Sequence, residues 1–402
     1  MEAAGKRRQK ALAFCPNGEN RRFSPFATTT GFSYNAAIIS HFVTEVHLYS
    51  REILPPPERL VTNGKPVFGT FAGFPCQLDI RGVEAPFGVP LPHFLTNFRI
   101  KSSLNFTFNI GSYIGAVDFF DLKAFGYAEV VFWEKESGRR LAYRTLMGPR
   151  RRFIPHNMEA GYCASFGKSR YIRISWDHAR DRLSVIFNLA GDSARPAVHG
   201  AFIAHYTSPL LCEMTTSVPS PTKRRCSASY LAATDIQGTL SLEKTKRADA
   251  IPMDKTDGYA LFNVNRNYYN FLSEAEFVTA AGVVGDKKVA FSIAALAEDA
   301  VDVDAINANL LFVNGACTPL PPVVITHPFG LLNKWVIQDT ENMVDLTFTP
   351  VSDNFRDMSF FVIHTKFHTV FGRFEGSLKS KDGEDIPIHN LAGIAKHQVL
   401  RL

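Results

Sequence analysis

The sequence has little net charge and no closely spaced cysteines. Its 402 residues include 44 Lys and Arg against 38 Asp and Glu, a net charge of +6, which is less than a dedicated nucleic-acid-binding protein usually carries. Its six cysteines contain no C-x-x-C pair, which argues against a zinc ribbon, a thioredoxin-type redox pair or a disulfide framework. We therefore expect reduced thiols and no nucleic-acid partner.

The common motifs of nucleotide, hydrolase and metal chemistry are also missing. The chain contains no G-x-G-x-x-G, G-x-x-x-x-G-K-[ST], G-x-S-x-G or H-E-x-x-H. His364 and His368 are the one pair of histidines four positions apart. In a strand they would lie about 13 Å from each other, too far apart to share an ion. We therefore expect neither a cofactor nor a metal site.

No segment near the N-terminus resembles an export signal. The charged stretch 1–10 is followed by only five apolar or small residues before Pro16, whereas a secretory signal needs an apolar run of about 7–15 residues. The charge-free segment 305–333 is long enough to span a membrane, but its prolines and glycines exclude a spanning helix. We expect an intracellular, cytoplasmic protein without a transmembrane span.

The chain is poor in long helix-forming stretches and rich in phenylalanine, with 34 Phe against 3 Trp. Residues 104–110 alternate strictly between apolar and polar side chains, a period of two that is typical of a strand with one buried face. Similar segments occur at 128–133, 139–146, 170–176, 182–188, 288–294 and 344–349. Short polar turns separate several of them, so we predict an all-β protein with antiparallel strands.

The pattern divides the chain into four parts. Residues 1–60 are irregular and predict an N-terminal extension, residues 61–214 a first β domain, and residues 228–402 a second. Between the domains, residues 215–227 combine two prolines, several Ser and Thr and a basic triplet, which is typical of a linker. We predict two barrel or sandwich domains packed together through apolar faces, with residues 1–60 able to attach a protein partner.

Two segments are candidates for a ligand site. Residues 259–271 gather aromatic rings and amides around one cation, Arg266, as a pocket wall does; an ordinary strand pair has the same composition. Asn307 and Asn309 lie in an apolar segment, where a buried amide needs partners from either a structural network or a ligand. The complete set of ligand-binding candidates is Tyr259, Arg266, Tyr268, Tyr269, Asn307, Asn309 and Trp335.

A separate candidate is a basic loop. Arg150, Arg151 and Arg152 stand between two prolines after a predicted strand. Three guanidinium groups in such a loop suit a phosphate or carboxylate headgroup. Solvated surface charge is the alternative interpretation.

A family resemblance rests on the segments 63–66, 68–69, 257–259, 335–339, 344–350, 370–376 and 382–383, and its spacing is distinctive in about the last 70 residues. Over roughly residues 61–402 the chain resembles domain-of-unknown-function family 2804, which is similar to the carotenoid hydratase and tocopherol cyclase group. The resemblance implies two lipocalin-like β-barrel domains and metal-free chemistry on an apolar isoprenoid or polyene. Of the family's polar run in the 262–267 region, this chain keeps only Arg266.

Three functions follow from these observations. The first is binding of a hydrophobic small molecule, such as a lipid or an isoprenoid-like compound, inside a β-barrel. The second is a metal-free hydratase, cyclase or isomerase acting on such a molecule, with a buried general acid such as Asp257, Asp345 or Glu375. The third is a structural subunit or scaffold whose cavities are filled by its own side chains.

Overall fold

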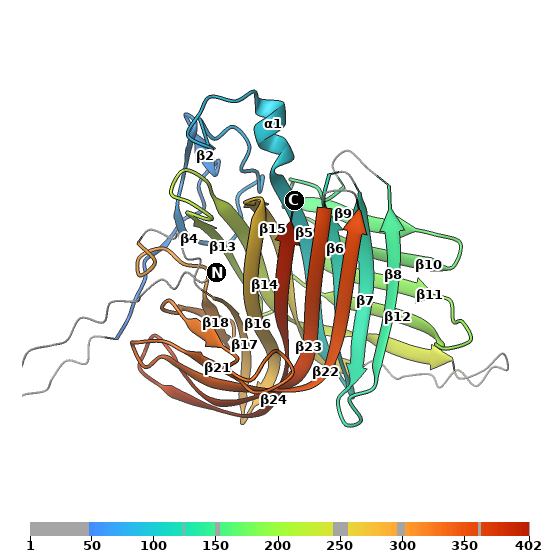
Figure 1. Ribbon diagram of the computed structural model, residues 1–402. Coiled ribbons are helices and arrows are strands. Elements are labelled where there is room, and N and C mark those ends of the chain that lie inside the picture. The colour runs from blue at the N-terminus through green and yellow to red at the C-terminus, as the bar shows by residue number, and fades with distance from the viewer. Residues whose placement is uncertain are drawn as a thin grey trace, which may run out of the picture. The chain divides into compact units, whose positions relative to one another are not determined.

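The computed structural model describes residues 48–123, 125–148, 153–243, 256–295, 302–360 and 363–401. These residues form β-sheets, in which every strand pair but one short parallel pair is antiparallel, and one short helix (Figure 1). The predicted all-β class is confirmed. Among the described residues, no helix has both the length and the apolar character that a membrane span requires.

The first sheet forms a nearly closed antiparallel barrel. Its path runs through β8 (Arg140–Met147), β7 (Gly126–Glu134), β6 (Tyr113–Asp121), β5 (Ile100–Ile110), β15 (Thr256–Tyr268), β14 (Ser227–Glu243), β12 (Ala197–Ala204), β11 (Arg182–Leu189), β10 (Arg170–Asp177) and β9 (Ala160–Phe166). Off this path lie β13 (Cys212–Val218), β4 (Gly69–Ala72) and β1 (Ile53–Leu54). Strands β8 and β9 are the two ends of the path, so β9 pairs with β10 alone.

The second sheet forms a half-barrel. Its order is β19 (Ala316–Pro319), β18 (Leu310–Val313), β17 (Lys287–Ala294), β16 (Leu272–Val284), β24 (Asp385–Arg401), β23 (Ile363–Lys379), β22 (Val344–Phe360), β21 (Trp335–Gln338) and β20 (Val324–Thr326). A small hairpin, β2 (Val61–Thr62) and β3 (Lys65–Pro66), and the helix α1 (His93–Phe98) complete the fold.

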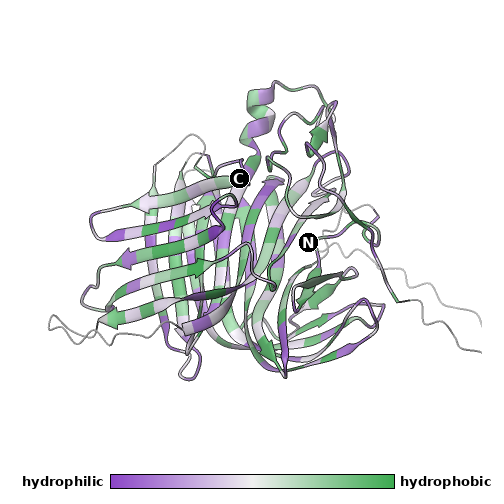
Figure 2. Cartoon of the chain, turned by 180° about the vertical axis from the view of Figure 1, so that it is seen from behind, coloured by the Kyte–Doolittle hydropathy of each residue, from purple (hydrophilic) through white to green (hydrophobic). Residues whose placement is uncertain are grey.

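The alternation seen in the sequence gives each sheet a separate core. In β15, Ala260, Phe262 and Val264 are fully buried in the core of the first sheet. In β22, Leu346 and Phe348 are fully buried in the core of the second. Apolar and polar residues alternate in colour along the strands in Figure 2, because successive side chains of a strand point to opposite faces.

The opposite faces of the two sheets pack against each other. Ile114 and Trp133 from the first sheet share a buried cluster with Phe371 and Ile394 from the second. Two further clusters join the sheets, one around Leu261 and one around the buried side chain of Tyr127. The predicted packing through apolar faces is therefore confirmed.

The strand pairing differs from the expected position of the linker. Residues 215–218 lie in β13, which pairs with β14 and β4. The side chains of Thr215, Thr216 and Ser217 are buried there. β14 and β15 also belong to the first sheet, and the chain enters the second sheet only after Tyr268. Hydroxyl side chains suit strands as well as linkers, so composition alone does not separate the two. The four-part domain division itself stays a prediction.

Candidate functional site

The interior of the first barrel is occupied by aromatic rings. The rings of Trp176 and Phe262 lie 5.6 Å apart, and the ring of Phe202 lies 5.7 Å from Phe187 and 4.8 Å from Phe108. All five side chains are at most 2% exposed. These rings pack against one another in the core, and the cavity described next lies nearer the barrel's open edge.

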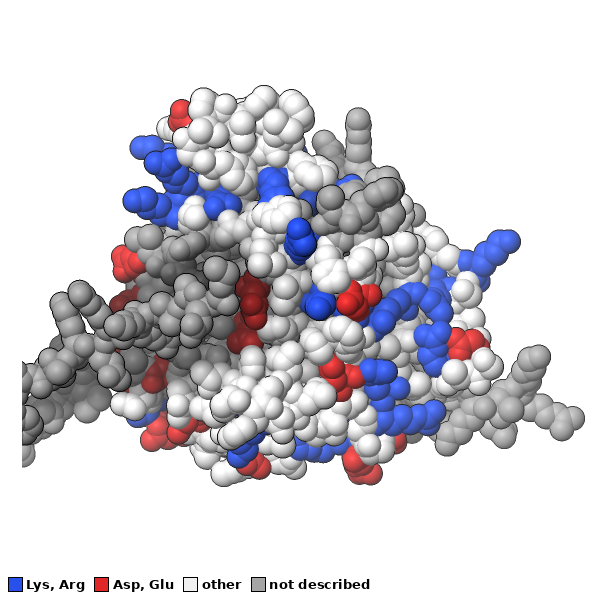
Figure 3. All heavy atoms as spheres, in the orientation of Figure 1, with Lys and Arg blue, Asp and Glu red and all other residues white. Residues whose placement is uncertain are grey.

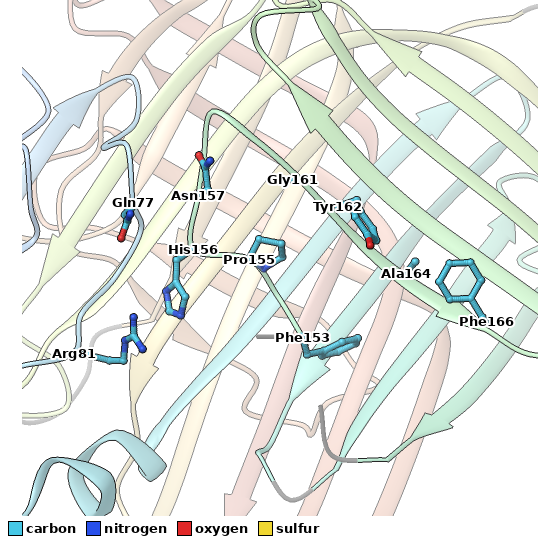
Figure 4. A pocket seen from close by; sticks show the side chains of 10 residues that line it. All are labelled: Gln77, Arg81, Phe153, Pro155, His156, Asn157, Gly161, Tyr162, Ala164 and Phe166. Carbon is cyan, nitrogen blue, oxygen red and sulfur yellow. The ribbon is translucent and has the colours of Figure 1, made fainter. Parts of the chain in front are cut away.

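A cavity of about 570 Å³ lies beside the edge strand β9 (Figure 4). Three segments supply its lining: β9, the stretch 153–157 that leads into β9, and the stretch 77–81 that follows β4. The lining residues are Gln77, Arg81, Phe153, Pro155, His156, Asn157, Gly161, Tyr162, Ala164 and Phe166. This volume falls in the range of small-molecule sites.

One side of the cavity is an apolar row on β9. Tyr162, Ala164 and Phe166 share one face of the strand, while Cys163 and Ser165 on the other face are buried. The rings of Tyr162 and Phe166 are 57% and 64% exposed. Exposed aromatic surface on one face of a strand is unfavourable in water, and a bound apolar molecule would cover it.

The other side of the cavity is polar. The guanidinium group of Arg81 donates to both carboxylate oxygens of Asp79, at 2.6–2.9 Å. Burial alone would raise the pKa of Asp79, but the hydrogen bonds from Arg81 outweigh it, so this pKa is lowered. The charge of Arg81 is thus already neutralised by a carboxylate, while half of its side chain faces solvent and the cavity.

His156 presents a hydrogen-bond acceptor beside this ion pair. Its Nδ1 lies 3.2 Å from the carbonyl oxygen of Leu78, and because a carbonyl only accepts, Nδ1 must carry the proton. Burial, reinforced by the positive charge of Arg266, lowers the pKa of His156 to about 4. At neutral pH the ring is therefore uncharged, and its Nε2 has a free lone pair.

Arg266, a candidate from the sequence, lies beneath this site and holds its walls together. Its side chain is 1% exposed and donates to the carbonyl oxygens of Leu78, Ile154 and Pro155 at 3.3, 2.9 and 2.6 Å. Burial lowers the pKa of Arg266 to about 10, so the group stays charged at neutral pH. It joins the 77–81 and 153–157 segments, and we assign it a positioning role.

The structure places the other predicted tyrosines apart from the cavity. Tyr259 lies under the ammonium group of Lys288. Tyr268 is buried in the first core and its ring faces Phe87. Tyr269 is buried in a cluster that also contains side chains of the second sheet. Among the three, none lines the cavity of Figure 4.

Asn307, Asn309 and Trp335 lie in the second half of the chain and have structural partners. The side-chain oxygen of Asn307 accepts from the backbone of Asn309 at 2.9 Å. The Asn309 side chain accepts from the backbone of Ala294 and donates to the carbonyl of Pro321, both at 2.9 Å. Trp335 is fully buried and donates to the carbonyl of Leu331 at 2.8 Å.

The remaining predictions concern charged residues. Arg150, Arg151 and Arg152 lie outside the described residues; Phe153, which follows them, lines the cavity. Asp257, Asp345 and Glu375 are all exposed, so none has the desolvated surroundings that a buried general acid requires.

A second polar constellation lies where the first barrel meets β13. Glu213 accepts hydrogen bonds from His178 Nε2, at 2.8 Å, and from the hydroxyl group of the buried Tyr230. The Nδ1 of His178 lies 3.0 Å from the carbonyl oxygen of Glu159. The His178 ring, the Glu213 carboxyl group and the Tyr230 hydroxyl group thus form one hydrogen-bonded set.

The ring of His178 lies between two aromatic rings. Phe74 is 4.1 Å away and Tyr206 3.8 Å away, centroid to centroid. These two ring contacts, together with the hydrogen bond to Glu213, fix the orientation of the imidazole.

Sequence reasoning missed both constellations, although part of the signal is visible. Tyr162 and Phe166 have the spacing of one strand face, with the small residue Ala164 between them. That pattern predicts an exposed aromatic row if the strand lies at a sheet edge. The meeting of Arg81 with His156, or of His178 with Glu213, depends on segments that are 35 or more positions apart, and no local pattern encodes it.

A family model matches most of the chain. The model of the family described as "Domain of unknown function (DUF2804)" matches residues 58–402, which confirms the resemblance expected for residues 61–402. A curated relative, glyceraldehyde-3-phosphate dehydrogenase 1 of Mucor circinelloides f. lusitanicus, is 36% identical over 56 residues. This chain spans 17% of the length of that relative, and the match covers 14% of this chain.

Several solved structures are similar to this chain at low identity. CghA with Sch210972 is 11% identical, with a TM-score of 0.47, over 87% of this chain and 98% of that one. Kievitone hydratase from Nectria haematococca is 8% identical, with a TM-score of 0.38, over 75% and 88%. An AttH-type protein from Nitrosomonas europaea is 10% identical, with a TM-score of 0.44, over 76% and 93%.

Proposed function

The chain belongs to the domain-of-unknown-function family 2804, and from this premise we propose that it binds a hydrophobic small molecule in the cavity beside β9. One observation carries the proposal. Exposed aromatic rings on β9 face the same 570 Å³ cavity as the polar groups of Arg81 and His156. Ligand sites have this composition, an apolar wall with a few directional polar groups.

The polar side of the cavity favours a neutral hydroxyl group over a carboxylate. The free lone pair on His156 Nε2 accepts a hydrogen bond, which a hydroxyl group donates and a carboxylate does not. The carboxylate of Asp79 already neutralises Arg81, so a second carboxylate would meet a like charge. Arg81 retains N–H groups that can donate to a hydroxyl oxygen. The proposed ligand is therefore an apolar body that carries a hydroxyl group.

The hydrophobic contribution and the polar contacts are both needed for micromolar affinity. Burying a 12-carbon chain contributes roughly 10 kcal/mol at about 0.8 kcal/mol per methylene group. Association costs an estimated ~4–15 kcal/mol. Affinity in the micromolar range then requires the lower part of that cost together with the polar contacts. For this reason the contribution of His156 should be measurable.

The experiment compares an alcohol with the matching acid. The full chain is titrated with dodecanol and with dodecanoate in a calorimeter, and separately the purified protein is extracted with organic solvent for mass spectrometry. We expect dodecanol to bind more tightly, and Phe166→Ala to weaken binding. The control is Phe271→Ala, which removes a phenylalanine of similar exposure that lies off the cavity. Equal effects of the two variants, or tighter binding of the acid, would contradict the proposal.

A second candidate function is conversion of the bound molecule by a hydratase, cyclase or isomerase. The observation that favours it is the hydrogen-bonded set of His178, Glu213 and Tyr230. Imidazole and carboxyl groups are common general acids, and neither needs a metal. Glu213→Gln keeps the shape of the side chain and removes its carboxyl group. If the extracted molecule is converted by the wild type and not by this variant, the enzyme function is supported.

The same extraction tests a third possibility, a scaffold role. If the extract contains no apolar molecule and another protein co-purifies at equal amounts, the ligand-binding proposal fails and the structural role is favoured. The face shown in Figure 3 carries both basic and acidic side chains, so a partner would meet both signs of charge there.

A further inference from the structure

Three metal-ligating side chains meet on the inner face of the second sheet. Glu276 on β16 and His397 on β24 are directly paired across neighbouring strands. Glu276 lies on the same face of β16 as Val278, and His397 on the same face of β24 as Ala395; both apolar residues belong to the core of the second sheet. His327, from the segment after β20, approaches from a third element. One ligand atom from each of these three side chains lies within 4.8 Å of the other two.

The three side chains already converge on one oxygen atom. His327 Nε2 lies 2.5 Å and His397 Nδ1 3.0 Å from Oε1 of Glu276. The outer nitrogen of His397, Nε2, lies 3.6 Å from the carboxylate of Glu274. A histidine that binds a metal through one nitrogen commonly has a carboxylate at the other, which orients the ring.

This donor set matches a known class of metal centre. Two histidine nitrogens with one carboxylate oxygen hold Zn²⁺ with an open fourth position, at about 2.0–2.2 Å from each ligand. Tetrahedral ligands at that length are about 3.4 Å from one another. The present separations of 2.5 and 3.0 Å therefore need to open by less than about 1 Å, which side-chain rotation provides.

The surroundings suit a partly enclosed cation. The side chains of Glu276 and His397 are 13% and 12% exposed and that of His327 is 27% exposed, so an ion can enter from solvent. The ring of His327 packs against Trp335 at 5.1 Å, which limits its motion. Beyond His397 lies His368, paired with Asp353 at 2.8 Å, and this carboxylate adds negative charge near the site.

We propose that Glu276, His327 and His397 form a binding site for one divalent transition-metal ion, such as Zn²⁺, with one coordination position left open. The site is separate from the cavity beside β9, which belongs to the first sheet. Nothing in the sequence predicts it, because the three residues lie 51, 70 and 121 positions apart. The one close histidine pair, His364 and His368, contributes no ligand to this trio.

The test uses the metal alone and the full chain. Protein stripped with a chelator is titrated with Zn²⁺ in a calorimeter, and Co²⁺ is added separately because its visible absorption reports coordination geometry. We expect one equivalent of Zn²⁺ to bind, and His397→Ala or Glu276→Gln to weaken binding on the order of 100-fold or more. The control His389→Ala removes an exposed histidine of the same strand and should leave binding unchanged.

Folding of each variant is checked by urea unfolding, so that loss of the site and loss of the fold are distinguished. Two results would overturn the proposal. One is the absence of saturable Zn²⁺ binding to the folded wild type. The other is binding that survives in a folded His397→Ala or Glu276→Gln protein, because the ion would then lie elsewhere. If Zn²⁺ binds as expected and dodecanol does not, the metal site stands while the ligand proposal fails.

Discussion

The neutral ring of His156 should make the protein less stable in mildly acidic solution. In the folded chain the pKa of His156 is lowered to about 4 from an ordinary value of 6.5, first by burial and then by the charge of Arg266. Between these two values the unfolded chain binds a proton that the folded chain does not. Unfolding is therefore favoured progressively as the pH falls from about 6.5 to about 4, and this effect levels off below that range.

The size of the effect follows from the gap between the two pKa values. Each pKa unit corresponds to about 1.4 kcal/mol, so the full gap corresponds to about 3 kcal/mol as an upper value. The lowered pKa of Asp79 acts in a different range. Its stabilising contribution is present above the ordinary value of 3.8 and is lost only as the pH falls further, so it leaves the His156 range undisturbed.

The measurement is urea unfolding at several pH values between about 4 and 7.5. His156→Gln keeps a donor for the carbonyl of Leu78 and cannot ionise, so its stability should fall by about 2–3 kcal/mol less than that of the wild type across this range. His389→Gln, at an exposed position, should follow the wild type. The burial argument is refuted if an NMR titration finds the pKa of His156 near 6.5. It is also refuted if the free energy of unfolding of both variants changes with pH by the same amount.

Three further predictions concern buried polar groups. Arg266→Met should lower the free energy of unfolding by roughly 3 kcal/mol, because the carbonyls of Ile154 and Pro155 lose this donor and that of Leu78 keeps only His156. Urea unfolding measures this, and a change below 1 kcal/mol would contradict it. Glu129→Gln should cost about 3 kcal/mol, since it leaves the 5%-exposed Arg356 without its carboxylate. Replacing both Glu129 and Arg356 by apolar residues should recover part of that loss in a double-mutant cycle. Asn309→Ala should lower the free energy of unfolding by about 2 kcal/mol in the same assay. It removes the hydrogen-bond partner of the Ala294 N–H group and of the Pro321 carbonyl.

The all-β fold was predictable because its signal is local. Residues 104–110 alternate in the sequence and lie within β5 (Ile100–Ile110), and residues 344–349 alternate and lie within β22 (Val344–Phe360). The buried face of a strand can be recognised from the alternation of its consecutive residues, whichever strand pairs with it. The family resemblance, which rests on short segments, was confirmed by the match over residues 58–402.

The site residues were harder to predict because composition does not report burial partners. Arg266 was singled out as the lone cation among rings and amides, and the structure places it under the cavity wall with three carbonyls as partners. The side chain of Asn307 accepts from the backbone N–H of Asn309, and the side chain of Asn309 bonds to the backbone of Ala294 and Pro321. A polar residue in an apolar segment indicates a buried group that needs hydrogen-bond partners. The sequence does not show whether a ligand or the chain itself supplies them.

The sequence by itself determined that side chains alternate between two faces and that the chain forms antiparallel sheets, because a period of two is a property of neighbouring residues. Tertiary structure decided which edges stay open and which distant residues meet. His156 faces the 77–81 segment, His178 reaches Glu213, and Glu276 meets His327 and His397. These meetings depend on strand order and register across the whole chain, and a one-residue shift in register would turn the same side chains to the opposite face.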